Sequence, residues 1–151
     1  MSGLSTDLKL LALDREGLDV ISAHVQNSCA RRKDFTWLSQ QKRFLLQLMR
    51  YDWAAAKLGR DERIGSILRF DRVGRVSHLG LLDGPGEEVL NLLGVRFERT
   101  DPPSGLIVLA FRDGALLRLE VECVEAELRD IGPRRPATAC AGHALTLAES
   151  S

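Results

Sequence analysis

The sequence predicts an α+β domain in which an antiparallel curved sheet, or a small open barrel, carries an N-terminal helix and a C-terminal capping helix. Three observations support this fold class. An apolar segment leads into a helical apolar stripe over residues 8–26, most of the chain from residue 29 alternates as strands do, and residues 105–131 combine a hairpin pattern with a second helical stripe.

The first element is a short strand, because residues 8–13 read LKLLAL. Asp14 follows at the position of a helix N-cap, where its carboxylate can accept a backbone N–H. Leu18, Ile21 and Val25 then stand at i, i+3 and i+7. The pattern predicts a helix over residues 15–26.

The middle of the chain predicts β-structure interrupted by one polar connection. Residues 29–53 contain alternating segments such as RFLLQLM, and residues 54–63 form an Ala-rich polar loop. Residues 64–73 predict a strand, and residues 76–82 predict its hairpin partner after a turn at Gly74.

The secondary structure of residues 83–97 is only partly predicted by the sequence. Residues 83–86, DGPG, predict a turn, and residues 87–94 fit either one helical turn or a strand. Val95 and Phe97 indicate extended chain.

Residues 105–131 contain the clearest pattern. The apolar arm 106–111 is followed by Asp113-Gly114, a pair that accepts positive φ and so favours a chain reversal. A two-residue loop places Ala110 opposite Leu117, whereas a three-residue loop with a bulge at Gly114 shifts the pairing by one residue.

After Val121 the period changes to that of an amphipathic helix. Val124, Leu128 and Ile131 stand at i, i+4 and i+7 with acidic residues between them. Gly132-Pro133 would end such a helix. We expect this helix to cover the apolar side of the hairpin.

The predicted domain spans residues 7–132. Residues 133–151 are rich in Pro, Ala, Ser and Thr without periodicity, so we expect a tail that is disordered or ordered only by docking. A length of 151 residues suffices for one core. The absence of a long apolar run and of a secretory signal predicts a cytoplasmic protein without a membrane contact.

No reaction chemistry is predicted. The three histidines and three cysteines are isolated along the chain, which argues against a metal site, and no serine or cysteine has the local context of a nucleophile. We therefore expect no catalytic residue, metal or cofactor, and the sequence favours a non-catalytic protein.

The basic residues are unevenly distributed, although the net charge is zero. Residues 31–75 hold 12 Lys or Arg and 5 Asp or Glu. The acidic C-terminal helix could neutralise this segment within the molecule, or the segment could face an acidic partner. A zero net charge and the lack of an aromatic-studded basic strand argue against nucleic-acid binding.

Five segments together carry a family resemblance. They are LKLLALDREGLDVISAHVQNS, QKRFLLQLMRYDW, LRFDRV, VLNLLGVRFE and LRLEVECVEAELRDIG. Over residues 7–132 the chain resembles the bacterial family catalogued as domain of unknown function 2948. The resemblance implies a small cytoplasmic bacterial protein and transfers no activity, cofactor or site residue. The chain departs from the family pattern at Asn27-Ser28 and in its tail.

Two hypotheses for function follow. The first is a non-catalytic interaction module whose basic segment, with the loop around Arg60, binds an acidic protein or a second copy of the chain. The sheet architecture is similar to pleckstrin-homology-like modules, an analogy that favours binding. Its candidate residues are Arg60, Arg63, Arg69 and Arg72.

The second hypothesis is a small-molecule binder or enzyme with a pocket at the open end of the sheet. Trp37 and Trp53 are its candidate binding residues, and His24 or His78 could contribute. The alternative interpretation is that the two tryptophans are structural and close the ends of a small barrel.

Overall fold

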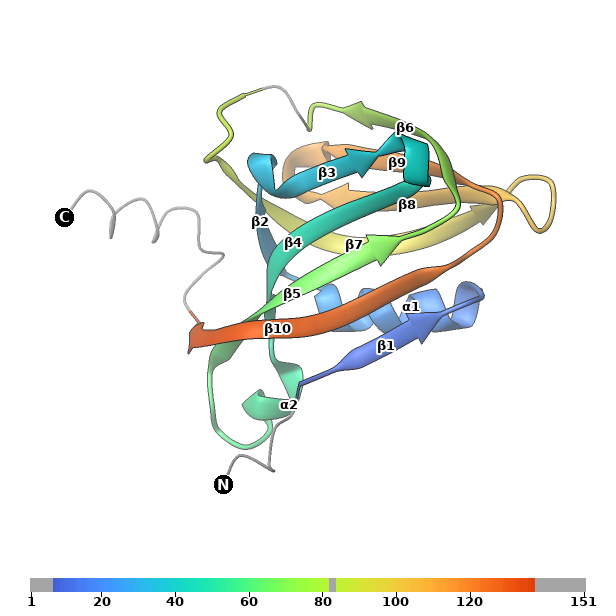
Figure 1. Cartoon of the computed structure of the whole chain (residues 1–151). Helices are drawn as coiled ribbons and strands as arrows, with labels where there is room; N and C mark the ends of the chain where they lie inside the picture. The colour runs from blue at the N-terminus through green and yellow to red at the C-terminus, as the bar shows by residue number, and fades with distance from the viewer. Residues whose placement is uncertain (1–6, 82–83, 138–151) are drawn as a thin grey trace.

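The computed structural model describes residues 7–81 and 84–137. In these residues the chain forms one curved antiparallel sheet of ten strands with a long helix, α1 (Arg15–Val25), and a short helix, α2 (Trp53–Ala56) (Figure 1). The strands are β1 (Lys9–Ala12), β2 (Ser28–Arg31), β3 (Phe35–Leu38), β4 (Arg43–Tyr51), β5 (Glu62–Phe70), β6 (Val73–Leu79), β7 (Val89–Arg99), β8 (Gly105–Phe111), β9 (Leu116–Val121) and β10 (Ala126–Pro136).

The strand order brings the two ends of the chain together. It runs β1-β10-β5-β4-β2-β7-β8-β9-β6, and β3 pairs with β4 beside this path. The last strand, β10, therefore lies between the first strand and β5. The curved antiparallel sheet predicted from the sequence is confirmed, and among the described residues the sheet is open, with β1 and β6 at its ends.

The inner face of the curved sheet encloses the core. Phe44, Leu46 and Leu48 alternate with outward residues along β4, and Leu109 and Phe111 of β8 join the same buried cluster. Because the sheet curls, strands that lie apart in the pairing order share one apolar interior.

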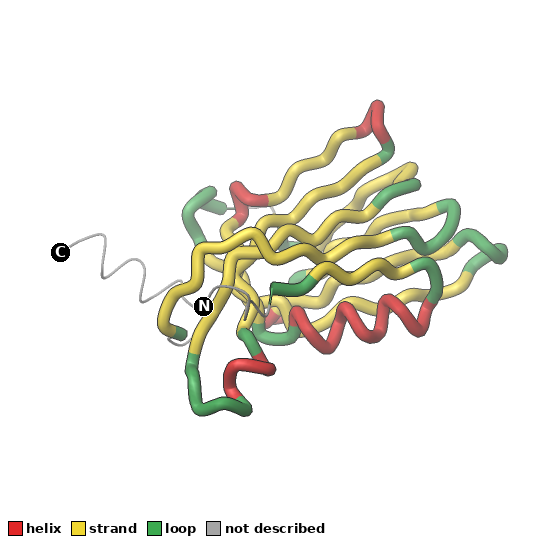
Figure 2. The backbone as a smooth tube through the Cα atoms, turned by 60° about the horizontal axis from the view of Figure 1, so that its bottom comes forward, coloured by secondary structure: helices red, strands yellow, loops and turns green. Residues whose placement is uncertain are grey.

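Helix α1 bridges β1 and β7 along one border of the sheet (Figure 2). The backbone N–H of Val95 in β7 donates to Ser22 Oγ at 2.9 Å. On the other side, Gly17 packs so closely on β1 that an added Cβ would lie 3.0 Å from Ala12 Cα.

The predictions for the N-terminal elements are confirmed. Helix α1 begins after Asp14, whose Oδ1 accepts the Gly17 N–H at 2.7 Å. Its predicted stripe of Leu18, Ile21 and Val25 is buried in the core.

The hairpin of β8 and β9 has the second of the two predicted registers. Leu109 lies opposite Leu117, and Ala110 lies opposite Leu116. Arg112, Asp113 and Gly114 form the link, and Asp113 and Gly114 have φ of 68° and 82°. The two-residue loop was therefore the wrong alternative.

The predicted C-terminal capping helix is wrong, because residues 126–136 form strand β10. Ala126, Leu128 and Asp130 alternate toward the inner face, so the apolar spacing fits a strand as well as a helix. The acidic residues assigned to a solvated helix face are partly buried in ion pairs: Glu127 contacts Arg69 at 2.8 Å, and Asp130 contacts Arg50.

The predicted hairpin between residues 64–73 and 76–82 is also wrong. Strand β5 pairs with β4 and β10, whereas β6 pairs with β9. Within the predicted connection 54–63, α2 occupies the first residues and β5 begins at Glu62. Of residues 87–94, left undecided by the sequence, residues 89–94 belong to strand β7, so the strand is the correct alternative.

Strand β10 continues past the predicted domain boundary at residue 132. Gly132, with φ of 78°, lies in a register shift of the β10–β5 pairing between Asp130 and Arg134. The strand bends there instead of ending.

Of the tail predicted at 133–151, residues 138–151 lie outside the described residues, as do residues 82–83 of the DGPG turn region. Within the described chain, neither helix has the length and apolar character needed to cross a membrane.

The close approach of β5 and β10 makes a glycine necessary at position 65. A Cβ at Gly65 would overlap with the carbonyl oxygen of Gly132, whereas a Cβ at Gly74 would meet nothing nearer than Glu120 O at 3.9 Å. We expect Gly65→Ala to lower the free energy of unfolding by about 1–3 kcal/mol, since overpacking forces the backbone apart. Urea denaturation measures this, with Gly74→Ala as the matched control. Equal stability of the two variants would contradict the prediction.

Candidate functional site

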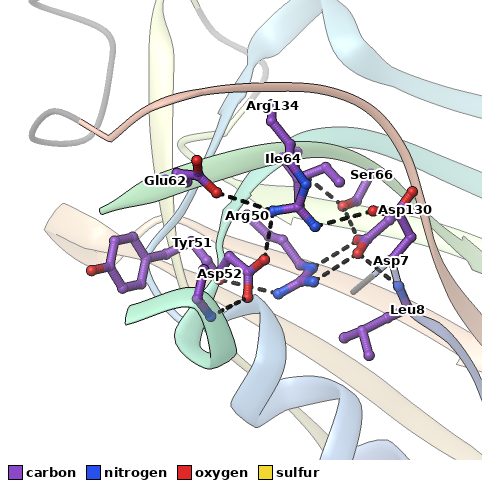
Figure 3. A network of polar contacts seen from close by, with 11 residues as sticks. Asp7, Leu8, Arg50, Tyr51, Asp52, Glu62, Ile64, Ser66, Asp130 and Arg134 are labelled. Carbon is purple, nitrogen blue, oxygen red and sulfur yellow. Dashed lines mark hydrogen bonds and ion pairs between the residues drawn. The ribbon is translucent and has the colours of Figure 1, made fainter. Parts of the chain in front are cut away.

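A buried ion pair lies on the inner face of the sheet (Figure 3). Arg50 Nε and Nη2 donate to Asp130 Oδ1 and Oδ2 at 2.8 and 2.7 Å, and the two side chains are 1% and 0% exposed. Ser66 Oγ donates to Oδ1 at 2.7 Å, and the Leu8 N–H donates to Oδ2 at 2.8 Å. One carboxylate thus joins β4, β5, β10 and the residue that precedes β1.

This carboxylate stays ionised. Burial raises the pKa of Asp130, but hydrogen bonds from Arg50, Ser66 and the Leu8 amide outweigh burial and hold the pKa below its usual value. A carboxylate that is fully hydrogen-bonded and sealed from solvent has no proton to exchange at neutral pH. We interpret the pair as a structural element that positions its neighbours.

A second charged cluster lies beside it and fixes α2. Asp52 caps this helix by accepting the Ala55 N–H at 3.0 Å, and its Oδ2 accepts Arg134 Nη1 at 2.7 Å. Arg134 Nη2 also contacts Asp7 Oδ1 at 3.1 Å, and Nη1 lies 3.4 Å from Glu62 Oε1. Burial raises the pKa of Asp52, but hydrogen bonds from Arg134 and the Ala55 amide outweigh burial and hold the pKa below its usual value.

The electrostatic field of both clusters acts on His24 of α1. Burial lowers the pKa of His24, and the positive charge of Arg50 lowers it further, while Asp130 and Asp52 oppose this in part. A histidine whose pKa is below its usual value of about 6.5 is neutral at physiological pH.

Next to the cluster around Asp52, helix α2 and the loop after it present an exposed surface. Tyr51 Oη donates to Asp61 Oδ1 at 2.7 Å, and the rings of Tyr51 and Trp53 meet edge to face at 4.7 Å between centroids. Trp53 and Leu58 are 38% and 68% exposed.

Two exposed arginines lie close to Asp61, the residue that Tyr51 holds. Arg60 follows the α2 loop, and Arg135 lies near the end of β10; both border a shallow depression of about 280 Å³. We define the α2 surface by Tyr51, Trp53, Leu58, Arg60 and Arg135.

The structure separates the arginines predicted to act together. Arg60 is exposed on the α2 surface. Arg63 is buried: its Nη1 donates to Asn27 O at 2.8 Å and to Met49 O at 3.3 Å, and burial lowers the pKa of its guanidinium.

Arg69 and Arg72 lie on strand β5 and in the turn after it. Arg69 contacts Asp71 at 3.0 Å as well as Glu127, and Arg72 contacts Glu125 at 3.3 Å. The acidic segment therefore neutralises part of the basic one within the molecule, although it does so from a strand and the turn before it.

The two tryptophans are also far apart. Trp37 of β3 lies opposite Phe44 near the start of β4, whereas Trp53 follows the end of β4. His24 lies on α1 and His78 lies on β6. Among residues 7–81 and 84–137, no group of three or more His, Cys, Asp or Glu side chains could hold a metal ion.

A pocket of about 390 Å³ lies on the outer face of the sheet, where β2, β4, β5 and β10 adjoin. Neither tryptophan lines it, and neither His24 nor His78 does so. It is therefore separate from the residues that the sequence assigned to a ligand pocket.

Sequence analysis missed Asp130 and Asp52. Asp130 was placed on a solvated helix face because its partner in β4 is distant in sequence. The available signal was Arg50, which shares the inward side of β4 with Leu46 and Leu48; a charged residue in an apolar row needs a buried partner.

The comparison with known protein families places most of the chain in one family. The sequence model of a family described as "Protein of unknown function (DUF2948)" matches residues 8–143, which include every strand from β1 to β10. The resemblance predicted from the sequence is thereby confirmed. No curated protein matches the chain, and no solved structure matches it.

The buried ion pair generates a mutational prediction. We expect Asp130→Asn to lower the free energy of unfolding by about 3–5 kcal/mol, because Arg50 is left buried without its counter-charge. The double variant Arg50→Met/Asp130→Asn should lose less than Asp130→Asn alone, since no unpaired charge remains. Urea denaturation of both, with the exposed Arg129→Gln as control, measures the difference. A double variant that is as unstable as the single one would contradict this explanation.

The lowered pKa values also predict acid sensitivity. Asp130 and Asp52 have folded-state pKa values below those of the unfolded chain, so their stabilisation is complete above about pH 4 and is lost as the pH falls through the folded values. Unfolding free energies measured over a pH series should fall on acidification, and Asp130→Asn should flatten this dependence. Asp113→Asn, in the exposed hairpin turn, should leave the dependence unchanged; an equal flattening would argue against Asp130 as its source.

Proposed function

The chain belongs to the family described as "Protein of unknown function (DUF2948)", and from its own surface we propose that it is a non-catalytic interaction module. It binds an acidic segment of a partner protein through the α2 surface. The observation that carries the proposal is the exposure of Trp53 and Leu58 in and after α2, together with Arg60 and Arg135, two exposed arginines that make no ion pair among the described residues.

The composition of the α2 surface supports binding to a protein. Trp, Tyr and Arg are the residue types that most often dominate binding energy at protein interfaces. Trp53 offers a large ring face, and Leu58 adds an exposed aliphatic side chain nearby in the sequence. A partner segment that covers them would bury apolar area and exclude water from the arginines.

The charge distribution supports an acidic partner. Several arginines of the basic segment are already engaged: Arg43 contacts Asp71 at 2.7 Å, Arg69 contacts Glu127 and Arg72 contacts Glu125. Arg60 and Arg135 make no such ion pair within the described chain. Their positive charge is therefore available to carboxylates from outside.

The surface is held in position before binding. Asp52 caps α2 from below, and the Tyr51 hydroxyl anchors Asp61 in the loop. A pre-formed surface loses less conformational entropy on association than a mobile one. The curved sheet supports the analogy with pleckstrin-homology-like modules, which remains part of this proposal, as does the cytoplasmic location implied by the family resemblance.

Charge reversal tests the proposal. Fluorescence anisotropy with fluorescein-labelled poly-glutamate, and with a peptide alternating glutamate and leucine, should show binding that weakens as salt increases. We expect Arg60→Glu/Arg135→Glu to weaken binding at least about tenfold, as the loss of two favourable charge contacts implies. Trp53→Ala should weaken binding of the leucine-containing peptide more than that of poly-glutamate.

The matched control is Arg118→Glu/Arg129→Glu, which makes the same charge change at exposed positions of β9 and β10. If this control weakens binding as much as the α2 variant, net charge explains the effect and the assigned surface is wrong. Sedimentation velocity on the same variants separates self-association from peptide binding: dimerisation that only the α2 variant abolishes would identify a second copy as the partner.

A further inference from the structure

The end of β10 is held apart from the rest of the strand. Residues 126–129 lie between β1 and β5, whereas residues 134–136 pair with β5 alone among the described strands. A register shift follows Asp130, and Gly132, with φ of 78°, bends the chain between the two sections. Hinges in proteins are a few residues at the ends of elements that absorb a change in φ and ψ. We call residues 134–137, which follow this bend, the β10 strap.

An ion pair fastens the β10 strap to the base of α2. Arg134 Nη1 donates to Asp52 Oδ2 at 2.7 Å, and Asp52 Oδ1 accepts the Ala55 N–H of α2. The Asp52 side chain is 1% exposed, and that of Arg134 is 30% exposed. A buried carboxylate that loses its ion-pair partner is destabilised more than an exposed one. The strap and the cap of α2 therefore depend on the same buried charge.

A main-chain contact joins the strap to the loop after α2. The Ala137 N–H donates to Asp61 O at 2.8 Å. Asp61 Oδ1 in turn accepts the Tyr51 hydroxyl, and the Arg60 N–H donates to Ala55 O at 3.0 Å. One residue, Asp61, thus connects the strap to Tyr51 and to the loop that carries Arg60.

The strap itself buries little surface. Arg135 and Pro136 are exposed, Arg134 and Ala137 are partly buried, and none of the four belongs to the hydrophobic core. Segments with few buried apolar contacts open locally at a free-energy cost below that of global unfolding. The strap is therefore suited to detach while the sheet stays folded.

The strap also carries part of the α2 surface. Arg135 borders the same depression as Arg60. Detachment of the strap would move Arg135 away from Arg60, and it would remove the Ala137 anchor from Asp61. The two arginines would then no longer face one ligand.

We propose that the β10 strap detaches and docks as a unit, and that its docking holds the α2 surface in the arrangement that binds an acidic segment. The first part rests on the contacts of the strap alone, whereas the second rests on the function proposed above. If only the docked state binds, the partner and the docked strap stabilise each other. Asp52 is a positioning residue in this mechanism, because its buried carboxylate acts through Arg134.

Hydrogen exchange followed by NMR tests the first part. The amides of Ala137 and Arg60 should exchange at least about a hundredfold faster than that of Leu109 in the core, because they need only the local opening. Their exchange should depend little on added urea, since that opening exposes little surface. An equal urea dependence of all three amides would overturn the strap, because it would show that only global unfolding releases them.

A variant of Asp52 tests what holds the strap. Asp52→Asn keeps an oxygen that caps α2 but removes the charge that pairs with Arg134. We expect exchange of the Ala137 and Arg60 amides to become about tenfold faster, as the loss of a largely buried ion pair implies. Arg134→Gln should reproduce this pattern. The matched control, Asp113→Asn in the exposed hairpin turn, should not; unchanged exchange in both test variants would contradict the assigned role of the pair.

Exchange with a bound ligand tests the second part. Poly-glutamate at about ten times its dissociation constant should slow Ala137 exchange about tenfold, because a ligand of the docked state suppresses opening. A peptide with glutamine in place of each glutamate is the control and should leave the rate unchanged. Poly-glutamate that binds by anisotropy without slowing Ala137 exchange would overturn the coupling and leave the proposed function standing. If poly-glutamate does not bind, the proposed function fails together with the coupling, and exchange without peptide still decides the first part.

Discussion

The Arg50–Asp130 ion pair is the interaction on which the arrangement of the termini depends. Removing a guanidinium and a carboxylate from water is costly unless each finds several partners. Here the carboxylate accepts Arg50 twice, the Ser66 hydroxyl and the Leu8 amide. These donors come from β4, β5 and the chain just before β1, so a displaced strand would leave a buried charge without compensation. The same network extends through Asp52 and Arg134 to α2 and thus determines where the exposed Trp53 lies.

The basic middle segment of the chain is partly neutralised by acidic residues near the C-terminal end of the described chain. Basic residues of the middle segment meet acidic residues of the last part of the sheet: Lys42 contacts Glu122 at 2.7 Å, Arg72 contacts Glu125, and Arg69 contacts Glu127. Most of these pairs are exposed, so each adds little stability, and of the three only Arg69–Glu127 joins β5 to β10. Some arginines of the described chain lie outside this set of ion pairs. Among the described residues, Arg60 and Arg135 make no ion pair, and both border the depression where β10 ends beside the start of β5.

Local chemistry made part of the fold predictable. The Asp14 cap, the stripe of α1 and the Asp113-Gly114 turn each act within a few residues, and all three appear in the structure. The helix predicted at residues 124–131 failed because its spacing suits both periods over so short a stretch, and only the distant partners β1 and β5 decide between them. The same limit hid the ion pair: Arg50 showed that a buried partner was needed, but no local signal pointed to Asp130. Trp53 and Arg60, two of the candidate residues, are exposed, whereas the burial of Arg63 depends on carbonyl groups that only the folded chain brings near.

The position of β10 has a consequence for biosynthesis. Its neighbours are β1 and β5, so β1 has no strand partner in the described sheet until β10 has left the ribosome. Apolar residues of β1 and α1 are meanwhile open to chaperones and to other nascent chains. Pairing that joins the two ends of a chain closes a long loop, which slows folding relative to a fold made of local contacts. For this domain, the synthesis of β10 is the event that permits β1 to join the sheet.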